Sequence, residues 1–498
     1  MRVGAGAAVR MTQSRPTPSP TDRRAVLDGF SGIASDSREV KPGFLFAALQ
    51  GTRADGAAFV ADAVARGAIA VLGTPSLREE VERLGVRFIA DENPRRRLAH
   101  LAAAHFSAQP RVIAAVTGTN GKTSVTVFLR QIWDNLGHDA ASLGTIGLVT
   151  KTRATALAHT TPDAIALHRV LAQLARDGIT HLALEASSHG LDQYRLDGAR
   201  IAAVGFTNIT RDHLDYHSDF AHYLRAKLRL FELVTPGGVA AVNADAPHAE
   251  EFLRLARERS LKLVTVGLFG EDLRLLSRVP QGEGQALEIA HAGERYRVWL
   301  PLVGDFQAAN ALLACGLAIG LGEEKERVLS TLGALRGAPG RLEKVAWSPR
   351  GAPIYVDYAH TPDALETVLT ALRPHVSGRL HLVFGCGGDR DRGKRPLMGE
   401  IAARLAERTI VTDDNPRSED PASIRRAILA ACPDAIEIGD RAEAISTAVA
   451  ALAPEDGLVI AGKGHESGQI VGDTVRPFLD REVAVKAALE MGGRAVSS

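Results

Sequence analysis

The amino-acid sequence predicts an α/β protein built from three domains. Short apolar, β-rich runs alternate with helical stretches, the pattern of mostly parallel sheets covered by helices. Breaks at Gln109-Pro110 and at the Gly/Pro-rich stretch 337–340 divide this pattern. A chain of 498 residues is also too long for one compact core. We therefore expect a disordered lead at residues 1–24, followed by domains at 25–110, 111–340 and 341–498.

The composition argues against several classes of protein. The chain has 59 basic and 58 acidic residues and a formal net charge of +1, so no broad surface for nucleic acid or acidic membranes is expected. Cys315, Cys386 and Cys432 form neither a disulfide framework nor a CxxC site, which favours a reducing cytoplasm. No apolar run approaches the roughly 18 residues that span a bilayer. We expect a cytoplasmic, monomeric protein.

In the first domain, β-rich runs at Phe44–Leu49 and Ala68–Leu72 flank an Ala-rich helical stretch at Ala57–Arg66. This order predicts a small α/β unit that closes at the break near Pro110. The Pro/Ser/Thr-rich lead before it lacks the Leu-rich core of a signal peptide.

The second domain opens with the apolar strand Val112–Val116, which turns through a Gly-rich loop into a helix at Ser124–Leu136. Further apolar strands, separated by helical segments, predict a mostly parallel sheet covered on both faces. These strands are His181–Leu184, Ala202–Thr207 and Gly238–Val242. The alternating stretch Leu287–Val298 predicts an attached antiparallel hairpin.

The third domain repeats the pattern of strands that end in polar or Gly-rich loops. Its expected strands are Ile354–Tyr358, Leu380–Phe384, Thr409–Thr412 and Leu458–Ala461. Because ligands of open α/β sheets bind beyond the carboxyl ends of the strands, we expect the functional residues there.

Residues 117–124, with the sequence TGTNGKTS, form the strongest local motif. Glycines let backbone N–H groups turn toward phosphates, and the following helix adds the positive end of its dipole. Lys122 would reach the β- and γ-phosphates, and the Thr123 hydroxyl would face Mg²⁺. The general P-loop pattern has glycine where this chain has Val116, so the motif predicts a variant ATP-binding loop.

This loop resembles that of the Mur ligases and of their folate-polyglutamating relatives. The rest of the family pattern follows in order, from Asp36 to Glu466, so the resemblance covers most of the chain. The matching segments are 185–189 (EASSH), 207–215 (TNITRDHLD), Asn310, Arg341 and Asp357. The resemblance implies a uridine-nucleotide-binding first domain, a central ATPase domain and a Rossmann-like third domain.

The resemblance also implies the ATP and metal site. Residues expected to bind ATP are Gly118, Thr119, Asn120, Gly121, Lys122, Thr123, Ser124, Asn310 (adenine), Asp357 (ribose) and Arg341 (phosphate, on domain closure). Thr123, Glu185 and His213 are the expected metal ligands, and Mg²⁺ suits their oxygen-rich surroundings. Lys227 matches the family's carbamylated lysine (N6-carboxylysine), and with Lys122, Glu185 and His213 it completes the expected catalytic set. Taken alone, Lys227 is typical of a solvated helix lysine.

A nucleotide-sugar substrate is implied for the first two domains. The residues expected to contact it are Ser35, Ser37, Thr52, Arg53, Ala54, His159, Thr160, Thr161, Ser187, Gln193 and Arg195. Arginine suits the carboxylate and diphosphate of such a ligand. His159 stands where the family usually has asparagine, and Ala57 stands where a larger polar residue is common, which puts these individual contacts in doubt.

The segment Asp414-Asn415-Pro416-Arg417 indicates which amino acid is added. In the family, this DNPR box reads the far end of meso-diaminopimelate, and lysine-adding members lack its arginine. Diaminopimelate has a carboxylate that lysine does not, and an arginine fork binds a carboxylate in bidentate fashion. Arg390, Gly462 and Glu466 would complete the pocket, with Glu466 pairing with the distal ammonium.

The resemblance therefore implies an ATP-dependent ligase of peptidoglycan precursor synthesis, which adds diaminopimelate to UDP-N-acetylmuramoyl-L-alanyl-D-glutamate through an acyl phosphate. Cys386, in a Gly-rich loop, is the one exposed candidate for a covalent nucleophile. Three alternatives stay open. They are a lysine-adding or folate-polyglutamating ligase, a P-loop switch or motor ATPase, and a regulator that only binds nucleotide.

Overall fold

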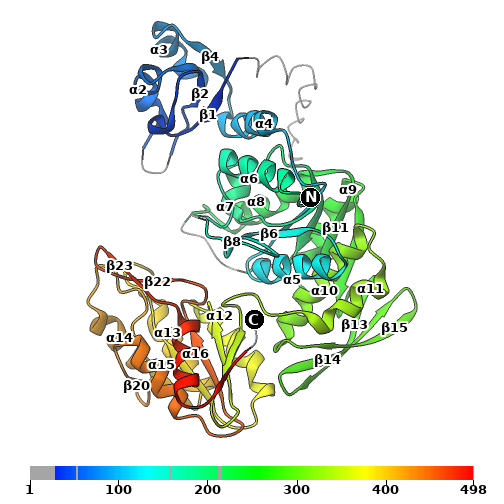
Figure 1. Ribbon diagram of the computed structural model, residues 1–498, viewed down its shortest axis with the longest axis vertical. Coiled ribbons are helices and arrows are strands. Elements are labelled where there is room, and N and C mark those ends of the chain that lie inside the picture. The colour runs from blue at the N-terminus through cyan, green and yellow to red at the C-terminus, as the bar shows by residue number, and fades with distance from the viewer. Residues whose placement is uncertain (1–28, 52–53, 158, 211–215, 497–498) are drawn as a thin grey trace, which may run out of the picture. The chain divides into compact units, whose positions relative to one another are not determined.

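The computed structural model describes residues 29–51, 54–157, 159–210 and 216–496, so the expected lead at 1–24 lies outside the described residues. The chain, whose elements are labelled in Figure 1, divides into two compact units. Unit 1 comprises the chain up to Ala108 together with Asp163–Gln173 and Gln193–Ala199. Unit 2 comprises the remainder, with a central sheet and a C-terminal sheet.

Unit 1 is a four-stranded parallel sheet in the order β1-β2-β3-β4. Its strands are β1 (Gly32–Ala34), β2 (Phe44–Ala47), β3 (Ala68–Gly73) and β4 (Arg87–Ala90). Its helices are α2 (Val60–Ala65), α3 (Arg78–Arg83), α4 (Pro94–Phe106) and the first part of α6 (Ala164–Arg176). Leu45 packs with Leu98 and Ile165 on one face of the sheet, and Phe46 packs with Val60 on the other. Burial of both faces explains why β1 and β2 are continuously apolar, whereas the edge strand β4 begins with the exposed Arg87.

The central sheet of unit 2 has eleven strands in the order β15-β14-β13-β12-β11-β10-β5-β9-β6-β7-β8. The strands from β13 to β6 are parallel, and antiparallel strands extend both ends. The parallel strands are β5 (Val112–Thr117), β6 (Ala140–Gly144), β9 (His181–Glu185), β10 (Ile201–Phe206), β11 (Val234–Asn243), β12 (Lys262–Gly267) and β13 (Leu273–Gln281). The antiparallel ones are β7 (Gly147–Thr150), β8 (Ala154–Thr155), β14 (Gly284–His291) and β15 (Glu294–Leu300).

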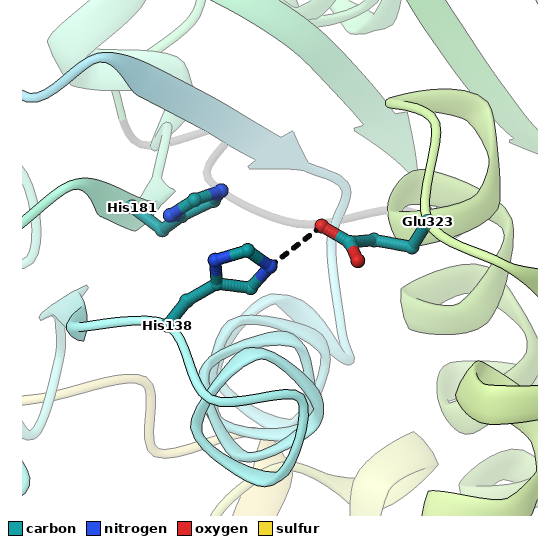
Figure 2. Close-up of side chains that lie close together, drawn as sticks. All are labelled: His138, His181 and Glu323. Carbon is teal, nitrogen blue, oxygen red and sulfur yellow. Dashed lines mark hydrogen bonds and ion pairs between the residues drawn. The ribbon is translucent and has the colours of Figure 1, made fainter.

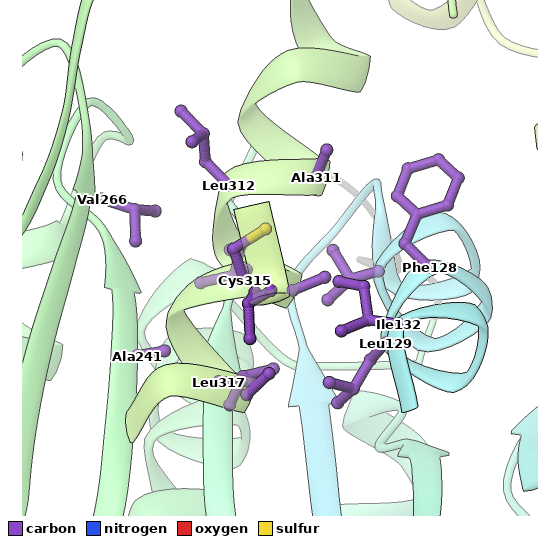
Figure 3. Close-up of a cluster of buried hydrophobic side chains, with 14 of the residues drawn as sticks. Phe128, Leu129, Ile132, Ala241, Val266, Ala311, Leu312, Cys315 and Leu317 are labelled. Atoms are coloured by element: carbon purple, nitrogen blue, oxygen red, sulfur yellow. The ribbon is translucent and has the colours of Figure 1, made fainter. Parts of the chain in front are cut away.

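Helices cover both faces of this sheet. On one face, α5 (Lys122–Asn135) and α10 (Asp305–Gly320) pack against each other and against the strands. Figure 3 shows their contact, with Phe128, Leu129 and Ile132 from α5 facing the apolar side chains of α10. On the other face, Phe252 of α9 (Ala249–Glu258) stacks on Phe206 with ring centroids 3.7 Å apart. Helices α7 (Ser188–Asp192), α8 (Phe220–Glu232) and α11 (Lys325–Ser330) complete this part.

The C-terminal sheet has the order β20-β19-β18-β21-β17-β16-β24 and is parallel from β20 to β17. Its strands are β16 (Glu343–Trp347), β17 (Pro353–Asp357), β18 (Leu380–Phe384), β19 (Arg408–Val411), β20 (Ile436–Glu437), β21 (Gly457–Ala461) and β24 (Arg494–Ala495). One face carries α12 (Pro362–Leu372), α13 (Lys394–Leu405) and α14 (Pro421–Leu429), and the other carries α15 (Arg441–Ala450) and α16 (Asp480–Glu490). A separate hairpin pairs β22 (Gly468–Val471) with β23 (Thr474–Pro477).

The strands predicted from the sequence are confirmed, with ends that shift by a few residues. The predicted hairpin at Leu287–Val298 is present as β14 and β15, and β13 extends it to a three-stranded meander. The predicted helix at Ala57–Arg66 begins as a 3₁₀ turn at Gly56–Phe59. Within the described residues, no helix has both the length and the apolar character needed to cross a membrane.

Candidate active site

The phosphate loop leaves β5 and enters α5 through backbone conformations that require glycine. Gly118 has φ 150° and Gly121 has φ 86°, both in the region that side chains disfavour. A Cβ added to Gly118 would collide with the Thr207 hydroxyl, and one added to Gly121 would collide with the Asn310 side chain. The loop is therefore in close contact with β10 and α10 as well as with its own strand and helix.

Thr207 and Asn208, which directly follow β10, form hydrogen bonds that hold the phosphate loop in place. Thr207 Oγ1 donates to Asn120 O at 2.6 Å, and Asn208 Oδ1 accepts from Asn120 N at 3.0 Å. Thr119 N donates to Asn208 O at 2.8 Å, and its hydroxyl lies 3.0 Å from the Tyr223 hydroxyl. Sequence reasoning did not assign this bracing role. The sequence feature that could have indicated it is the polar pair Thr207-Asn208, directly after the strand β10 that pairs with β5.

Lysines 122 and 227 place their ammonium groups on the carbonyls of the loop. Lys122 Nζ donates to Gly118 O at 2.9 Å and to Thr119 O at 2.8 Å. Lys227 Nζ donates to Gly118 O at 2.6 Å and lies 4.4 Å from the centroid of the Tyr223 ring. Lys227 is buried, so it is not the solvated helix lysine that its sequence surroundings alone would suggest. The two amines concentrate positive charge where the motif predicts phosphate.

Glu185 is the last residue of β9 and is buried one strand away from the phosphate loop, opposite Val116 of β5. Its carboxylate accepts from Thr145 N at 2.8 Å and from the Thr145 hydroxyl at 3.1 Å. Thr145, in the turn between β6 and β7, is a partner that the sequence did not reveal. Of the expected metal ligands, Thr123 lies in the first turn of α5, whereas His213 lies outside the described residues.

Three residues were expected to contact the nucleoside or its phosphates. Asn310 of α10 is buried beside Gly121. Asp357 ends β17, where it accepts from Leu342 N at 2.5 Å and Ala359 N at 2.7 Å. Burial raises the pKa of Asp357 to about 6. The Arg341 guanidinium lies 4.6 Å over the Tyr358 ring, and its Nε is buried with no hydrogen-bond partner.

The DNPR box is held by a network centred on Lys463, a fully buried residue that sequence reasoning missed. Lys463 Nζ donates to Asn415 Oδ1 at 3.0 Å, to Gly468 O at 2.7 Å and to Glu466 Oε2 at 3.2 Å. Asn415 Nδ2 donates to the same Glu466 oxygen at 2.8 Å. The structure thus brings Asn415 and Glu466 together both directly and through the Lys463 ammonium. The sequence offered a weak signal, because Lys463 lies inside the motif GKGHE.

Arg417 has a left-handed backbone (φ 52°) and is fixed from two sides. Its N–H donates to Ile470 O at 3.1 Å, which attaches the box to β22. Its Nη1 donates to Gly388 O at 2.8 Å. A guanidinium has five N–H donors, so this bond orients the fork and leaves further donors for a carboxylate. Arg390, in the neighbouring loop, is exposed.

The other residues expected to bind diaminopimelate, together with Cys386, follow the carboxyl ends of strands β18, β19 and β21 of the C-terminal sheet. Asp414 and Asn415 are buried, and a Cβ on Gly462 would approach the Asp414 carboxylate to 2.7 Å. The expectation that Cys386 is exposed is wrong, because its side chain is only 3% exposed and contacts Met398. Burial raises the pKa of the Cys386 thiol to about 11, so it is a poor nucleophile.

The residues expected to bind the nucleotide sugar are divided between the two units. In unit 1, Ser37 is buried and Ser35 is exposed, and Arg195 Nη2 donates to Gln193 Oε1 at 2.8 Å. Ala54 is exposed, and its neighbours Thr52 and Arg53 lie outside the described residues.

In unit 2, Thr161 and Ser187 lie beside Glu185. Ser187 Oγ donates to Thr161 Oγ1 at 3.1 Å, and Thr161 Oγ1 donates to Glu185 O at 2.9 Å. The Thr160 hydroxyl lies 3.1 Å from the Thr145 hydroxyl, which in turn bonds the Glu185 carboxylate. His159 is exposed. A hydroxyl cluster therefore adjoins the carboxyl end of β9.

Comparison with known families accounts for most of the chain. Residues 29–106 match the model described as Mur ligase family, catalytic domain. Residues 116–318 match the Mur ligase middle domain, and residues 340–464 match the Mur ligase, glutamate ligase domain.

Curated relatives match at high identity. A protein of Bradyrhizobium diazoefficiens is 57% identical over 464 residues, which cover 92% of this chain and 94% of that protein. A protein of Caulobacter vibrioides is 54% identical over 457 residues, covering 90% and 93%. Both are named UDP-N-acetylmuramoyl-L-alanyl-D-glutamate–2,6-diaminopimelate ligase.

Solved structures of the same family are also similar to this chain. A UDP-N-acetylmuramoyl-L-alanyl-D-glutamate–2,6-diaminopimelate ligase superimposes with a TM-score of 0.70 at 35% identity, covering 93% of this chain and 95% of the other. A folylpolyglutamate synthase of Mycobacterium tuberculosis shares the fold, with a TM-score of 0.60 at 18% identity over 74% of this chain and 92% of its own.

Proposed function

The chain belongs to the Mur ligase family, and from that premise we propose that it joins meso-diaminopimelate to UDP-N-acetylmuramoyl-L-alanyl-D-glutamate at the expense of ATP. The position of the Arg417 side chain is the observation that favours diaminopimelate as the added amino acid. Its guanidinium is oriented by Gly388 O, and Asn415 of the same box is paired with Glu466, so the box presents a fork for a carboxylate and holds an anion suited to an ammonium.

ATP binding is assigned to the phosphate loop 117–124, with Lys122 on its β- and γ-phosphates. Asn310, Asp357 and Arg341 are assigned to the rest of the nucleotide. The unpartnered Nε of Arg341 supports a role in binding an anion. Asp357, by contrast, accepts two backbone bonds, so it would share its oxygens with a ribose hydroxyl.

The donor set beside the loop suits Mg²⁺. Glu185 and Thr123 offer the hard oxygen ligands that this ion prefers, and the ion commonly keeps several waters. They would hold it with the phosphates, and it would neutralise charge on the transferring group. His213 stays assigned as a further ligand, and Lys227 as the carbamylated lysine. Carbamylation would turn the amine that now donates to Gly118 O into an anion.

The reaction follows from positioning. Lys122 and the loop amides hold ATP so that the glutamate carboxylate of the substrate attacks the γ-phosphate, which gives an acyl phosphate and ADP. Arg417 and Glu466 hold the distal end of diaminopimelate, so that its reactive amine attacks the acyl carbon. The C–N bond forms, the C–O bond to phosphate breaks, and inorganic phosphate leaves. The enzyme needs no covalent nucleophile, in keeping with the buried Cys386.

The nucleotide sugar is assigned to residues of both units. Ser35, Ser37, Gln193 and Arg195 belong to unit 1, with Thr52, Arg53 and Ala54 in the same section of the chain. His159, Thr160, Thr161 and Ser187 belong to unit 2. We assign the three functional domains to residues 25–110, 111–340 and 341–498 and the protein to the cytoplasm, because the composition and the three unpaired cysteines suit that compartment.

The decisive experiment measures phosphate release from ATP with the UDP-linked dipeptide present, comparing diaminopimelate with L-lysine at equal concentration. We expect strong release with diaminopimelate and little with lysine. Arg417→Lys keeps the charge but loses the bidentate fork, so kcat/KM for diaminopimelate should fall at least tenfold. Equal use of both amino acids would remove the specificity role of Arg417. Release that ignores both amino acids would overturn the ligase assignment.

A further inference from the structure

Three side chains with metal-binding atoms meet at the amino ends of the strands of the central sheet, at the end opposite to the phosphate loop. They are His138, which follows α5, His181, which begins β9, and Glu323, which follows α10 (Figure 2). The phosphate loop lies at the carboxyl ends of the strands, whereas His181 lies at an amino end. The group is thus separate from the proposed ATP site and rests on different observations.

The same backbone motif presents two of these side chains. After α5, His138 N donates to Trp133 O at 2.9 Å and Gly137 N donates to Asp134 O at 3.2 Å, with Gly137 at φ 92°. After α10, Glu323 N donates to Ala318 O at 3.1 Å and Gly322 N donates to Ile319 O at 3.0 Å, with Gly322 at φ 108°. Both are Schellman motifs. Because α5 and α10 pack directly together, the motifs bring His138 Nε2 to 2.8 Å from Glu323 Oε1.

His181 joins them from the first position of β9. Its ring centroid lies 4.1 Å from that of His138, and its backbone N–H donates to Asp139 O at 3.2 Å. Its Nδ1 lies 2.8 Å from the Thr180 hydroxyl, which fixes the orientation of the ring. A hydrogen bond at one ring nitrogen directs the other toward a metal, an arrangement that is usual for histidine ligands.

We propose that His138, His181 and Glu323 form a binding site for a divalent transition metal, with Zn²⁺ as its best occupant. One ligand atom from each residue lies within 4.8 Å of the others. Shifts of about 1 Å would bring all three to the roughly 2.0–2.2 Å bonds of a zinc centre. Two imidazoles and one carboxylate, with water in the fourth position, form a known zinc ligand set. Metal binding would displace the proton shared by His138 and Glu323.

The surroundings provide access. A surface pocket of about 450 Å³ borders His138 and is lined by Asp134, Asp139, Asp177, Lys151 and Arg153 among others. His138 and Glu323 are partly exposed, with side-chain exposures of 28% and 20%. A hydrated cation can therefore reach His138 and Glu323 from solvent, with the buried His181 behind them. Within the described part of the chain, no other three His, Cys, Asp or Glu donor atoms gather as closely.

Metal binding would cross-link three elements of unit 2 and so stabilise its fold. The metal would join the carboxyl ends of α5 and α10 to the amino end of β9. Helix α5 begins at Lys122 and α10 carries Asn310, so both helices also frame the phosphate loop. Because a metal that binds only the folded state stabilises it by mass action, the transition of unit 2 should shift to higher temperature.

The test is Zn²⁺ titration of the full chain, freed of metal and without nucleotide or substrate, so it does not depend on the proposed function. Calorimetry should show that Glu323→Gln and His138→Asn each bind one equivalent less than the wild type, with no loss of fold by circular dichroism. His248→Gln is the matched control, since His248 bonds Glu251 at 2.9 Å on an exposed helix end, and no third donor joins this pair among the residues that the structure describes.

Two further readouts sharpen the outcome. Co²⁺ should give the wild type an intense visible absorption, typical of four- or five-coordinate metal, that Glu323→Gln lacks. Zn²⁺ should raise the melting temperature of the wild type and of His248→Gln, and raise it less for Glu323→Gln. Equal stoichiometry in the wild type and in both ligand variants would overturn the proposal.

Discussion

Two buried lysines illustrate how a single residue can organise a site. Lys227 and Lys463 both place an ammonium on backbone carbonyls, at Gly118 and Gly468 respectively. Burial of a charge is costly unless the charge is hydrogen-bonded, and each lysine is hydrogen-bonded beside a predicted ligand site. Lys227 bonds a carbonyl 109 positions away and Lys463 bonds Asn415 48 positions away, which is why local sequence does not reveal these two contacts.

Replacement of Lys463 by methionine should weaken diaminopimelate binding specifically. The change removes the cation that joins Asn415 to Glu466, and hydrogen bonds to charged groups contribute about 1.5–3 kcal/mol. KM for diaminopimelate should rise at least tenfold, while KM for ATP stays within about twofold. Steady-state kinetics with each substrate varied in turn measures the split. Lys486→Met, at an exposed position on α16, is the control. A parallel rise in both KM values would indicate a general structural defect instead.

The cysteines should be inert toward thiol reagents in the native protein. Cys315, Cys386 and Cys432 are all buried, and burial raises the pKa of Cys315 to about 12 and that of Cys386 to about 11. A colourimetric disulfide reagent should therefore react slowly with the folded chain and with three equivalents in denaturant. Rapid native labelling of Cys386 would show that its loop opens readily.

At the scale of elements, the phosphate loop depends on close contact between backbone and neighbouring strands. Gly118→Ala would place a methyl against the Thr207 hydroxyl at φ 150°, where a side chain is also strained. ATP affinity, measured by calorimetry, should fall at least tenfold. Gly85→Ala is the control, because Gly85 has φ 69° but nothing within 4 Å of an added Cβ. It should lose about 1 kcal/mol of stability and bind ATP normally. Unchanged ATP affinity in Gly118→Ala would refute the assigned loop geometry.

Local sequence patterns predicted the strands and helices well, because an apolar run or a glycine turn depends only on residues that are adjacent in sequence. The strands β5, β9 and β18 lie where their apolar runs predicted, and α5 starts two residues before the expected Ser124. Long-range partners were not predictable in this way. The bracing of Asn120 by Thr207 and the bond from Thr145 to Glu185 join residues separated by 87 and 40 positions. Such pairings follow from sheet order, which periodicity does not determine.

At the scale of the whole molecule, the chain returns to its first unit after leaving it. Asp163–Gln173 and Gln193–Ala199 belong to unit 1, although they follow the phosphate loop in sequence. The break at Gln109-Pro110 was visible in the sequence, but these returning segments were not, because the apolar face of Asp163–Gln173 resembles that of any covering helix and Gln193–Ala199 is a short run of turns. Unit 1 therefore completes its core only with residues from the middle of the chain, such as Ile165.

His168 joins the two returning segments and should make unit 1 sensitive to acid. Its Nε2 lies 2.9 Å from Asp197 O, and burial lowers its pKa to about 4 from an ordinary value of 6.5. The folded state thus binds fewer protons than the unfolded state between pH 6.5 and 4, so the stability that His168 contributes is full above pH 6.5 and falls with acidification. Between pH 7 and pH 5 the loss is about 2 kcal/mol.

His168→Gln has no titrating ring, so it should lack this loss. Thermal unfolding should show the wild type more stable at pH 7, with the difference narrowing at pH 5, because only the wild type must exclude a proton from a buried ring. His248→Gln, at an exposed position, should keep the wild-type pH dependence. A gap between wild type and His168→Gln that stays constant from pH 7 to pH 5 would mean that His168 titrates alike in both states, and the acid sensitivity of unit 1 would then have to arise from other groups.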